Sequence, residues 1–447
     1  MLKTITRTGQ IILLAPPTVL AFFAVTIPTL AQPAANTAVQ QQISETDAAA
    51  LLVQAGRLDD AKRVLAHVLE VSPTDNEALF LRGLIALAEK RYEDAIADFR
   101  LILVAEPTRE RVRLEFARAF FLDGDYENAE RNFRFARAGD LPPEAKANID
   151  QYLAVILRLK RLSYDIGLAL AQDTNVNGAT SVHQVDLYGL PFTLSDNARR
   201  KSGAGVAIDL GGEWSPILFN DIKAKLGGHV HRLEYGGSAF DDMTLSGNAG
   251  PEFLLPRWQI DTLMTGFRRW YGNTPYNQGL GGRIAATFAL LPDVQLGAAF
   301  DMQAVSYRQV TEQDGTVASG NLEATYTLSP SSLVRASGGI AVQTAKVSSL
   351  ADTTNWIAFD YYQDLPWGFS ANIEPALSWT RSDAPLLAFG IARDDHIWAA
   401  RLDLLNRRIE YRGFTPRLSF VYTNQVSTIS LYRYSRMQVQ IGLTRQF

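Results

Sequence analysis

The feature that most constrains this chain is the strict alternation of its last eleven residues, 437–447, which read M-Q-V-Q-I-G-L-T-R-Q-F. The apolar side chains share one parity: Met437, Val439, Ile441, Leu443 and Phe447. A strand sends alternate side chains to opposite faces, so the segment predicts a strand with one apolar and one polar face. Eleven residues is about the length that a tilted strand needs to cross a bilayer.

The same alternation recurs upstream, in residues 164–171, 222–230, 296–304, 369–379 and 414–422. The polar faces of these segments carry Lys223, Lys225, Asp301 and Asn372. A soluble sandwich would hide the apolar faces inside, whereas a membrane barrel turns them outward and keeps the charges in its lumen. Alternation alone fits both folds. The terminal aromatic Phe447 favours the barrel, because such an ending resembles the last strand of outer-membrane barrels, which the barrel-assembly machinery recognises.

One residue departs from the pattern, because Arg445 shares the apolar face of the terminal segment. We expect it at the membrane interface, where such a charge costs only about 0–1 kcal/mol and its long side chain can reach water.

Composition limits how the chain can insert into a membrane. The 447 residues carry a formal net charge of −4 and no cysteine. Nothing here indicates nucleic-acid binding, and the missing cysteine excludes disulfides, thiol chemistry and a lipid attached to the chain's own cysteine. After the N-terminus no apolar run reaches the roughly 18 residues of a membrane helix. Insertion must therefore use strands, because unpaired backbone cannot cross lipid.

Residues 1–31 have the features of a secretory signal peptide. Lys3 and Arg7 precede an apolar stretch over residues 11–27, and Ala31 supplies the small residue before a cleavage site. A permanent membrane anchor is the alternative, but prolines at 16, 17 and 28 would interrupt its helix. Residues 32–44 then form a short linker.

Residues 45–140 repeat with a period of 34. Matching residues recur at that spacing: Leu58, Tyr92 and Tyr126; Ala61, Ala95 and Ala129; Leu65, Phe99 and Phe133. Pro73 and Pro107 keep the same period, and Gly83 and Ala117 hold its small-residue position. The spacing is typical of tetratricopeptide repeats, in which each unit is a helix pair and stacking of units supplies the core. Residues 142–162 predict one more helix that caps the stack.

The first helix of each pair lines the concave face of such a solenoid. The small residues set the register and predict these inward positions: Glu77, Phe80, Leu84, Leu87, Arg111, Leu114, Arg118 and Phe121. Many of them can equally be core between units. Arg111 and Arg118 are better binding candidates, because packing does not need charge. We take Phe80, Leu84, Arg111, Arg118 and Phe121 as the candidate surface for binding another protein.

The composition changes at Ser163, where helical spacing gives way to alternation with more glycine and aromatic residues. Residues 163–447 allow about 14 strands at roughly 20 residues per strand and connection. The expected fold is therefore an α + β membrane protein: a tetratricopeptide-repeat α-solenoid over residues 45–162, then a transmembrane antiparallel β-barrel over 163–447. An even strand number places both barrel ends, and hence the repeats, on the periplasmic side.

The sequence carries no phosphate-binding loop, dinucleotide fingerprint, H-E-x-x-H or G-x-S-x-G motif, so we expect no enzyme activity and no cofactor. His229 and His231 share one strand face. They could bind a metal, but a pair of lumenal polar residues is the better interpretation, since no third ligand is suggested nearby. Asp173, Asn175 and Asn177 follow the first strand, where Asx side chains usually form turns by bonding their own backbone.

Three runs around the junction of the two halves carry a family resemblance. They are R-V-R-L-E-F-A-R-A-F-F-L-D-G-D-Y-E-N-A from Arg111, L-P-P-E-A-K-A-N-I from Leu141, and L-A-Q-D-T-N-V-N from Leu170. They resemble the surface lipoprotein assembly modulator (Slam) family, the outer-membrane component of type eleven secretion. The order of parts also fits that family, and Asp173, Asn175 and Asn177 match its motif at the start of the barrel.

The resemblance implies a translocator that moves a surface lipoprotein, or a soluble relative, from the periplasm to the outside. The implied partners are that client protein, outer-membrane lipid and the barrel-assembly machinery, with no catalytic residue and no metal. An exopolysaccharide exporter is the second interpretation, because such proteins also join these repeats to a barrel, although usually with more repeats. A general porin ranks third, because it needs no repeat domain.

Overall fold

The computed structural model describes residues 44–411 and 413–446. The predicted signal peptide, residues 32–43 of the predicted linker, and Phe447 lie outside the described residues.

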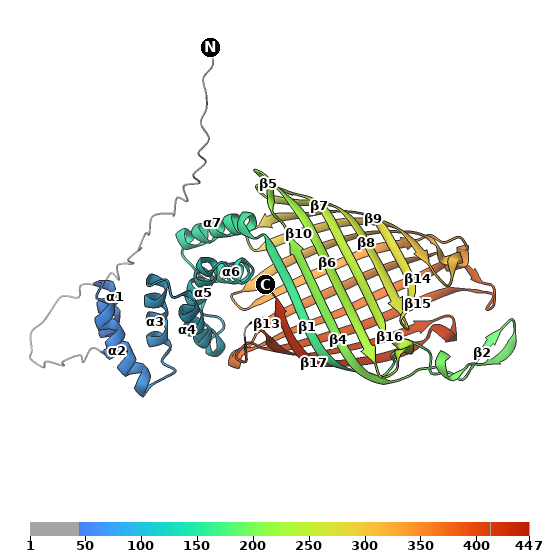
Figure 1. Cartoon of the computed structure of the whole chain (residues 1–447), viewed down its shortest axis with the longest axis horizontal. Coiled ribbons are helices and arrows are strands. Elements are labelled where there is room, and N and C mark those ends of the chain that lie inside the picture. The colour runs from blue at the N-terminus through green and yellow to red at the C-terminus, as the bar shows by residue number, and fades with distance from the viewer. Residues whose placement is uncertain (1–43, 412, 447) are drawn as a thin grey trace, which may run out of the picture. The chain divides into compact units, whose positions relative to one another are not determined.

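Seven helices form the N-terminal part of the described chain (Figure 1). They are α1 (Glu45–Gln54), α2 (Leu58–Val71), α3 (Asn76–Ala88), α4 (Tyr92–Ala105), α5 (Glu110–Asp123), α6 (Tyr126–Arg137) and α7 (Pro143–Leu159). The second helix of each pair begins at Leu58, Tyr92 and Tyr126, so the 34-residue period fixes where these helices start. Ser44 and Asp75 cap α1 and α3 by accepting backbone N–H bonds from the first turn.

The helical core consists of the residues that recur with the period. Ala61, Ala95 and Ala129 are fully buried, as are the larger Leu65, Phe99 and Phe133 one turn further along. Small side chains let paired helices approach, and the larger ones fill the space between units. The capping helix α7 buries Ile149 and Ile156 against the same cluster.

The second half forms a closed barrel of 14 antiparallel strands (Figure 1). They are β1 (Leu162–Asp173), β4 (Gly203–Trp214), β6 (Ile222–Tyr235), β7 (Asp242–Leu254), β8 (Trp258–Tyr271), β9 (Thr274–Leu291), β10 (Val294–Tyr307), β11 (Gly315–Ser329), β12 (Ser332–Gln343), β13 (Asp352–Asp364), β14 (Phe369–Leu386), β15 (Ile391–Asn406), β16 (Thr415–Ser427) and β17 (Tyr434–Gln446). Short β5 (Ile217–Phe219) pairs with β6, and β2 (Gln184–Leu187) pairs with β3 (Leu190–Thr193) in the connection between β1 and β4.

The barrel closes where the first strand meets the last. Strands β1 and β17 pair antiparallel from Asp165 opposite Gln446 to Asp173 opposite Gln438. Every other strand pairs with its neighbours along the chain, so the topology is an up-and-down meander. Closure removes free edges, which is the condition for strands to cross lipid. The predicted repeat solenoid and transmembrane barrel are confirmed.

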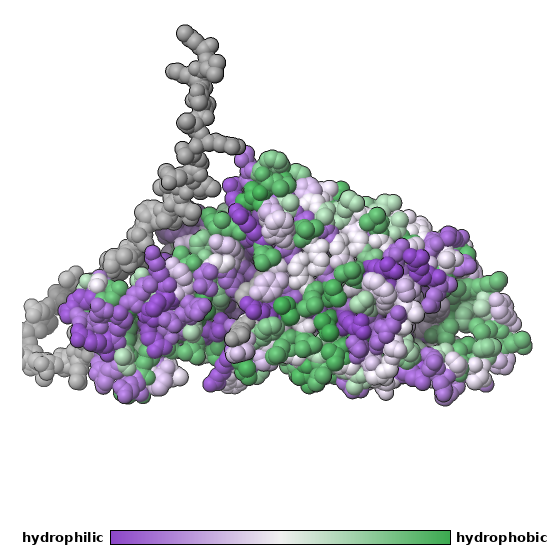
Figure 2. Space-filling view, viewed as in Figure 1, coloured by the Kyte–Doolittle hydropathy of each residue, from purple (hydrophilic) through white to green (hydrophobic). Residues whose placement is uncertain are grey.

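The apolar parity of each strand faces outward. Leu168, Leu170, Met264, Leu322 and Ile441 each expose more than half of their surface on the barrel exterior. Figure 2 shows hydrophobic residues over the barrel wall, whereas hydrophilic residues predominate over the helices. The opposite parity fills the lumen with ion pairs, such as Arg283–Asp301 at 2.7 Å and Arg417–Asp403 at 2.8 Å. Among residues 44–411 and 413–446, no helix has the length and apolar character needed to span a membrane.

Candidate functional site

The candidate binding surface on the repeat helices, here called the repeat face, has a buried part and an exposed part. The ring of Phe80 is buried, with its centroid 5.9 Å from that of Phe99, and Leu84 is half-buried against the same core. Arg111 is exposed, and its guanidinium lies 5.4 Å from the centroid of the Phe80 ring. This cation–π contact orients Arg111 without consuming its hydrogen-bond donors. Among Phe80, Leu84 and Arg111, only Arg111 is exposed, so a partner protein can contact it directly.

The other two predicted docking residues lie about two and three turns further along α5. Arg118 is half-buried and pairs with Glu115 at 2.6 Å. Burial opposes its charge, but Glu115 and Tyr152 outweigh burial and raise the pKa of Arg118, so the side chain stays cationic. Phe121 packs edge-on against Tyr152, with ring centroids 4.9 Å apart. It therefore ties α5 to the capping helix.

The helices contact the barrel through a charge-asymmetric interface. The helices supply arginines and the barrel connections supply carboxylates, in the pairs Arg100–Glu410 at 3.0 Å, Arg113–Asp364 at 3.0 Å, Arg137–Asp293 at 3.1 Å and Arg158–Asp221 at 2.7 Å. Near the start of β1, Lys223 donates from Nζ to the carbonyl oxygen of Lys160 at 2.9 Å. These contacts fix the repeat domain against one end of the barrel.

The most buried of these contacts centres on Asp364, at the end of β13. Its carboxylate accepts hydrogen bonds from Arg113, from the hydroxyl of Tyr362 and, at 2.8 Å, from Ser370. Arg131 donates to the Tyr362 hydroxyl, and its guanidinium lies 4.8 Å from the centroid of that ring. Arg113 is only 4% exposed, so removing one partner of its ion pair would leave an uncompensated buried charge, at a cost of about 3–5 kcal/mol.

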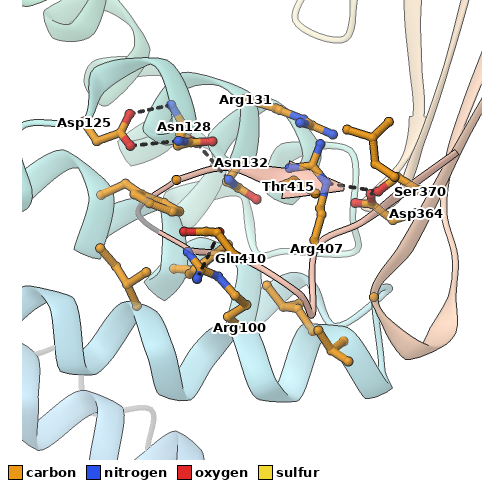
Figure 3. Close-up of a pocket in the computed structure, with 18 of the residues that line it drawn as sticks. Arg100, Asp125, Asn128, Arg131, Asn132, Asp364, Ser370, Arg407, Glu410 and Thr415 are labelled. Atoms are coloured by element: carbon orange, nitrogen blue, oxygen red, sulfur yellow. Dashed lines mark hydrogen bonds and ion pairs between the residues drawn. The ribbon is translucent and has the colours of Figure 1, made fainter. Parts of the chain in front are cut away.

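A cavity of about 610 Å³ lies between α4, α5, α6 and the barrel connections β13–β14 and β15–β16. We call it the inter-domain cavity. In Figure 3, Arg131 and Arg407 lie beside Asp364 and Ser370, whereas Asp125 and Asn128 lie at the opposite side. Apolar side chains of α4 and α5 form a further wall: Ile96, Leu103, Phe116 and Phe120.

A second cavity of about 880 Å³ occupies the lumen near the helices. Glu127 and Lys160 line it from the helical side, and Asp165, His229 and Arg283 line it from the strands. Repeat helices therefore border the space inside the barrel. His229 Nε2 lies 3.8 Å from Asp165 and His231 Nδ1 lies 2.6 Å from Asp209, which makes each histidine part of a lumenal polar pair.

No cluster of three or more metal-binding side chains occurs within residues 44–411 and 413–446.

The Asp173-x-Asn175-x-Asn177 motif organises the barrel end away from the helices. Asp173 is fully buried and accepts hydrogen bonds from Arg436, from Tyr235 at 2.8 Å and from Gln438 at 3.0 Å. The Asn175 N–H donates to Asp173 Oδ1 at 2.8 Å, and Asn175 Oδ1 accepts from the N–H of residue 179 at 3.1 Å. These are the turn hydrogen bonds that the sequence predicted.

Asn177 bonds a different branch of the same connection. It donates to the carbonyl oxygens of Asn197 at 3.0 Å and Arg199 at 2.7 Å, and it accepts from the N–H of Lys201 at 3.1 Å. The motif thus joins the β1–β4 connection to the β1–β17 seam. Its residues are structural in this arrangement.

At the terminal strand, Arg445 lies over the rings of Tyr164 and Phe414, at 5.5 and 5.7 Å from their centroids. Stacking on two aromatic rings covers this cation at the helix-facing end of the strand. Phe447 lies outside the described residues, so its role as an assembly signal stays a prediction.

Two family profiles match the chain. The profile of the tetratricopeptide repeat matches residues 46–110, and that of "Surface lipoprotein assembly modifier" matches residues 163–447, which is more than half of the chain. The chain belongs to the surface lipoprotein assembly modifier family. Membership together with the closed, externally apolar barrel assigns it to the outer membrane.

Curated relatives carry the same family name. Surface lipoprotein assembly modifier 1 of Neisseria meningitidis is 27% identical over 208 residues, which cover 46% of this chain and 41% of that protein. The modifiers of Pasteurella multocida and Moraxella catarrhalis are 18% and 23% identical and cover 82% and 86% of this chain, and 75% and 76% of their own lengths. The match to the Neisseria protein thus spans less than half of that relative.

Solved structures give weaker likeness. A FadL homologue of Pseudomonas aeruginosa matches with a TM-score of 0.38 at 8% identity, covering 72% of this chain and 93% of its own. The Pseudomonas putida toluene transporter TodX matches with a TM-score of 0.33 at 9% identity, covering 65% and 91%. Similarity at this level carries no argument about function.

The inter-domain interface is what sequence reasoning missed. The sequence patterns assigned no role to Arg100, Arg113, Arg131 and Arg137, although arginine is dense between residues 100 and 137. That density was the available signal. Nothing in the sequence shows that Asp364, 251 residues beyond Arg113, is the partner.

Proposed function

We propose that this chain moves surface lipoproteins, or soluble relatives of them, from the periplasm to the cell surface. The observation that carries the proposal is the placement of the repeat helices directly against one end of the barrel, where Glu127 and Lys160 border the lumenal cavity. A client held by the repeats would thus lie at the entrance of the barrel. An even number of strands puts both ends of the barrel segment on one side of the membrane, and in this proposal that side is the periplasmic one, where a client arrives.

The capture step uses the exposed cation on the repeat face. Arg111 presents its guanidinium over Phe80, and Arg118 remains charged about two turns further along. Guanidiniums in this setting suit carboxylates and backbone carbonyls of an incompletely folded chain. Phe80, Leu84 and Phe121 set the shape of the face beneath them, since they are buried or half-buried.

The transport step draws its free energy from folding. The sequence carries no nucleotide-binding motif, and the periplasm offers no ATP. A barrel of 14 strands is narrower than the 16–18 strands that leave an open porin channel, so a folded client does not fit through a closed pore. The client therefore passes incompletely folded, and folding outside prevents its return.

Charge reversal on the repeat face tests the capture step. The double variant Arg111→Glu and Arg118→Glu is expected to leave the barrel assembled and to trap the client in the periplasm. Client exposure on intact cells is measured by protease or antibody accessibility, and barrel level is measured by heat-modifiable migration on gels. Arg63→Glu, at an exposed position of α2, is the matched control.

Comparison of the double variant with a single variant separates an effect on folding from an effect on client capture. Glu at position 118 would stand beside Glu115 and repel it, so the single variant Arg111→Glu provides the version that leaves the core intact. Normal client display by both variants would remove these arginines from the mechanism. Loss of display with the Arg63 control as well would indicate a general effect of charge rather than a docking face.

A further inference from the structure

Three guanidiniums at the inter-domain cavity lie around a single carboxylate, that of Asp364. Arg113, Arg131 and Arg407 come from α5, α6 and the β15–β16 connection. Within residues 44–411 and 413–446, only Arg113 of these three forms an ion pair, with Asp364 at 3.0 Å. Arg131 and Arg407 contact neutral hydroxyls instead, those of Tyr362 and Ser370. The cluster thus holds about two more positive charges than its own carboxylate neutralises.

The electrostatics of Arg113 and Arg131 agree with an incomplete site, whereas for Arg407 burial is outweighed by Tyr362 and Asp364, which raise its pKa. Burial lowers the pKa of Arg113, and the Asp364 carboxylate offsets this only in part. Burial and then the neighbouring Arg407 lower the pKa of Arg131. In addition, the buried Nε of Arg113 has no hydrogen-bond partner within the described residues. Unneutralised buried cations are costly, so an anion entering here would be stabilised.

The cavity beside the cluster has the size and lining of a site for an amphiphile. Its volume of about 610 Å³ falls in the range of roughly 300–1,000 Å³ that is usual for ligand pockets. One wall is apolar, formed by Ile96, Leu103, Phe116 and Phe120. A ligand with one anionic group and an apolar tail would match both the arginine cluster and the apolar wall.

The connections that line this cavity also carry exposed apolar and aromatic residues. Trp367 is 73% exposed, Ile409 60% and Tyr411 72%. They are sequence neighbours of the lining residues Gly368 and Glu410, at the ends of strands whose outer face is apolar. Aromatic residues at strand ends are typical of the membrane interface. We infer that the barrel end beside the cavity lies at the level of the lipid headgroups.

We propose that the inter-domain cavity binds a phospholipid of the surrounding membrane, with its phosphate beside Arg131 and Arg407 and an acyl chain along the α4–α5 wall. Arginine forks match phosphate oxygens in pairs. An acidic peptide suits the cavity less well, because Glu93, Asp123, Asp125 and Glu127 also line it and would repel a chain with several negative charges. The phosphate of a bound lipid would offset part of the cluster's excess positive charge, and the lipid would hold the repeat domain against the barrel.

Isothermal titration calorimetry of the full-length protein in nonionic detergent tests the proposal, with dioctanoyl phosphatidylglycerol as the probe. Binding is expected to weaken at least tenfold, about 1.4 kcal/mol, in Arg131→Gln and in Arg407→Gln. Arg63→Gln, which removes an exposed charge on α2, should bind like the wild type. Arg131→Lys retains the charge and should lose less affinity than Arg131→Gln. Heat-modifiable migration on gels confirms that each variant is folded.

Three comparison ligands define what would overturn the proposal. Dioctanoylglycerol binding as tightly as the phospholipid would show that the arginines do not recognise phosphate. Inorganic phosphate binding as tightly would indicate a site for the free ion, and displacement of the lipid by a hexaglutamate peptide would indicate a peptide site. Unchanged lipid affinity in both Gln variants would equally refute it. Client display is not measured, so any of these results leaves the proposed transport function standing.

Discussion

Replacing Gly83 by Ala probes the closest helix contact of the repeat domain. A Cβ built on Gly83 would lie 2.6 Å from Cε1 and 2.9 Å from Cζ of Phe99, both too close for unstrained contact. Phe99 is fully buried and packs against Phe80, so its ring has no free space to move into. The substitution therefore forces the two helices apart or the ring out of its preferred position.

Two opposing effects set the magnitude. Ala in a helix interior is better than Gly by about 1 kcal/mol, whereas overpacking a filled core costs about 1–3 kcal/mol. The net expectation is a loss of about 1 kcal/mol in the unfolding free energy of the helices. For a domain of this size, about 1 kcal/mol corresponds to a fall of roughly 4 °C in melting temperature.

Thermal unfolding of the full-length protein in detergent, followed by circular dichroism at 222 nm, measures this fall. The equivalent position of the next unit is Ala117, which is fully buried and tolerates its methyl group. The reciprocal variant Ala117→Gly should also lower the melting temperature, because it loses packing and helix propensity. A rise of about 4 °C for Gly83→Ala, as helix propensity alone would give, would refute the packing argument.

Three further predictions concern the barrel and the interface. Asp173→Asn leaves the half-buried Arg436 without its counter-charge and should cost roughly 2–3 kcal/mol, seen as earlier loss of the folded band in heated gel samples. Ile441→Arg puts a charge on the outer face at mid-strand and should cost about 2–4 kcal/mol, whereas Gln440→Arg enters the lumen and should assemble normally. Burial alone would raise the pKa of Glu130, but Arg134 and Lys160 outweigh burial and lower this pKa below its usual value. Its contribution to helix stability is therefore present above about pH 4.5 and is lost as the pH falls through the lowered pKa, which acid titration by circular dichroism would detect.

The sequence predicted the parts of the fold that depend on local periodicity. Spacing by 34 predicted the helix pairs, whose second helices start at Leu58, Tyr92 and Tyr126, and two-residue alternation predicted the two faces of the strands, including β17. Both patterns can be recognised in the sequence because residues at equivalent positions of a repeat or a strand have similar environments. The buried status of Phe80 was left open, since one helix face can serve core or binding.

The inter-domain cavity could not be predicted in the same way. It joins Arg131 to Arg407, which are far apart in sequence and come from a helix and a barrel connection. Their meeting depends on how the solenoid sits against the barrel, which no periodicity encodes. The same holds for the buried anchor Asp173, whose partners Tyr235 and Arg436 reach it only after the barrel has closed.

The most direct test of the central claim is a comparison of surface lipoproteins on cells with and without this chain. Intact cells are treated with protease, and the released peptides and the retained lipoproteins are identified by mass spectrometry. We predict that, without the chain, one or a few lipoproteins lose their surface peptides and accumulate inside, and that a variant lacking residues 45–161 with an assembled barrel behaves the same way. An unchanged set of surface lipoproteins together with loss of an exported polysaccharide would contradict the claim and favour polymer export.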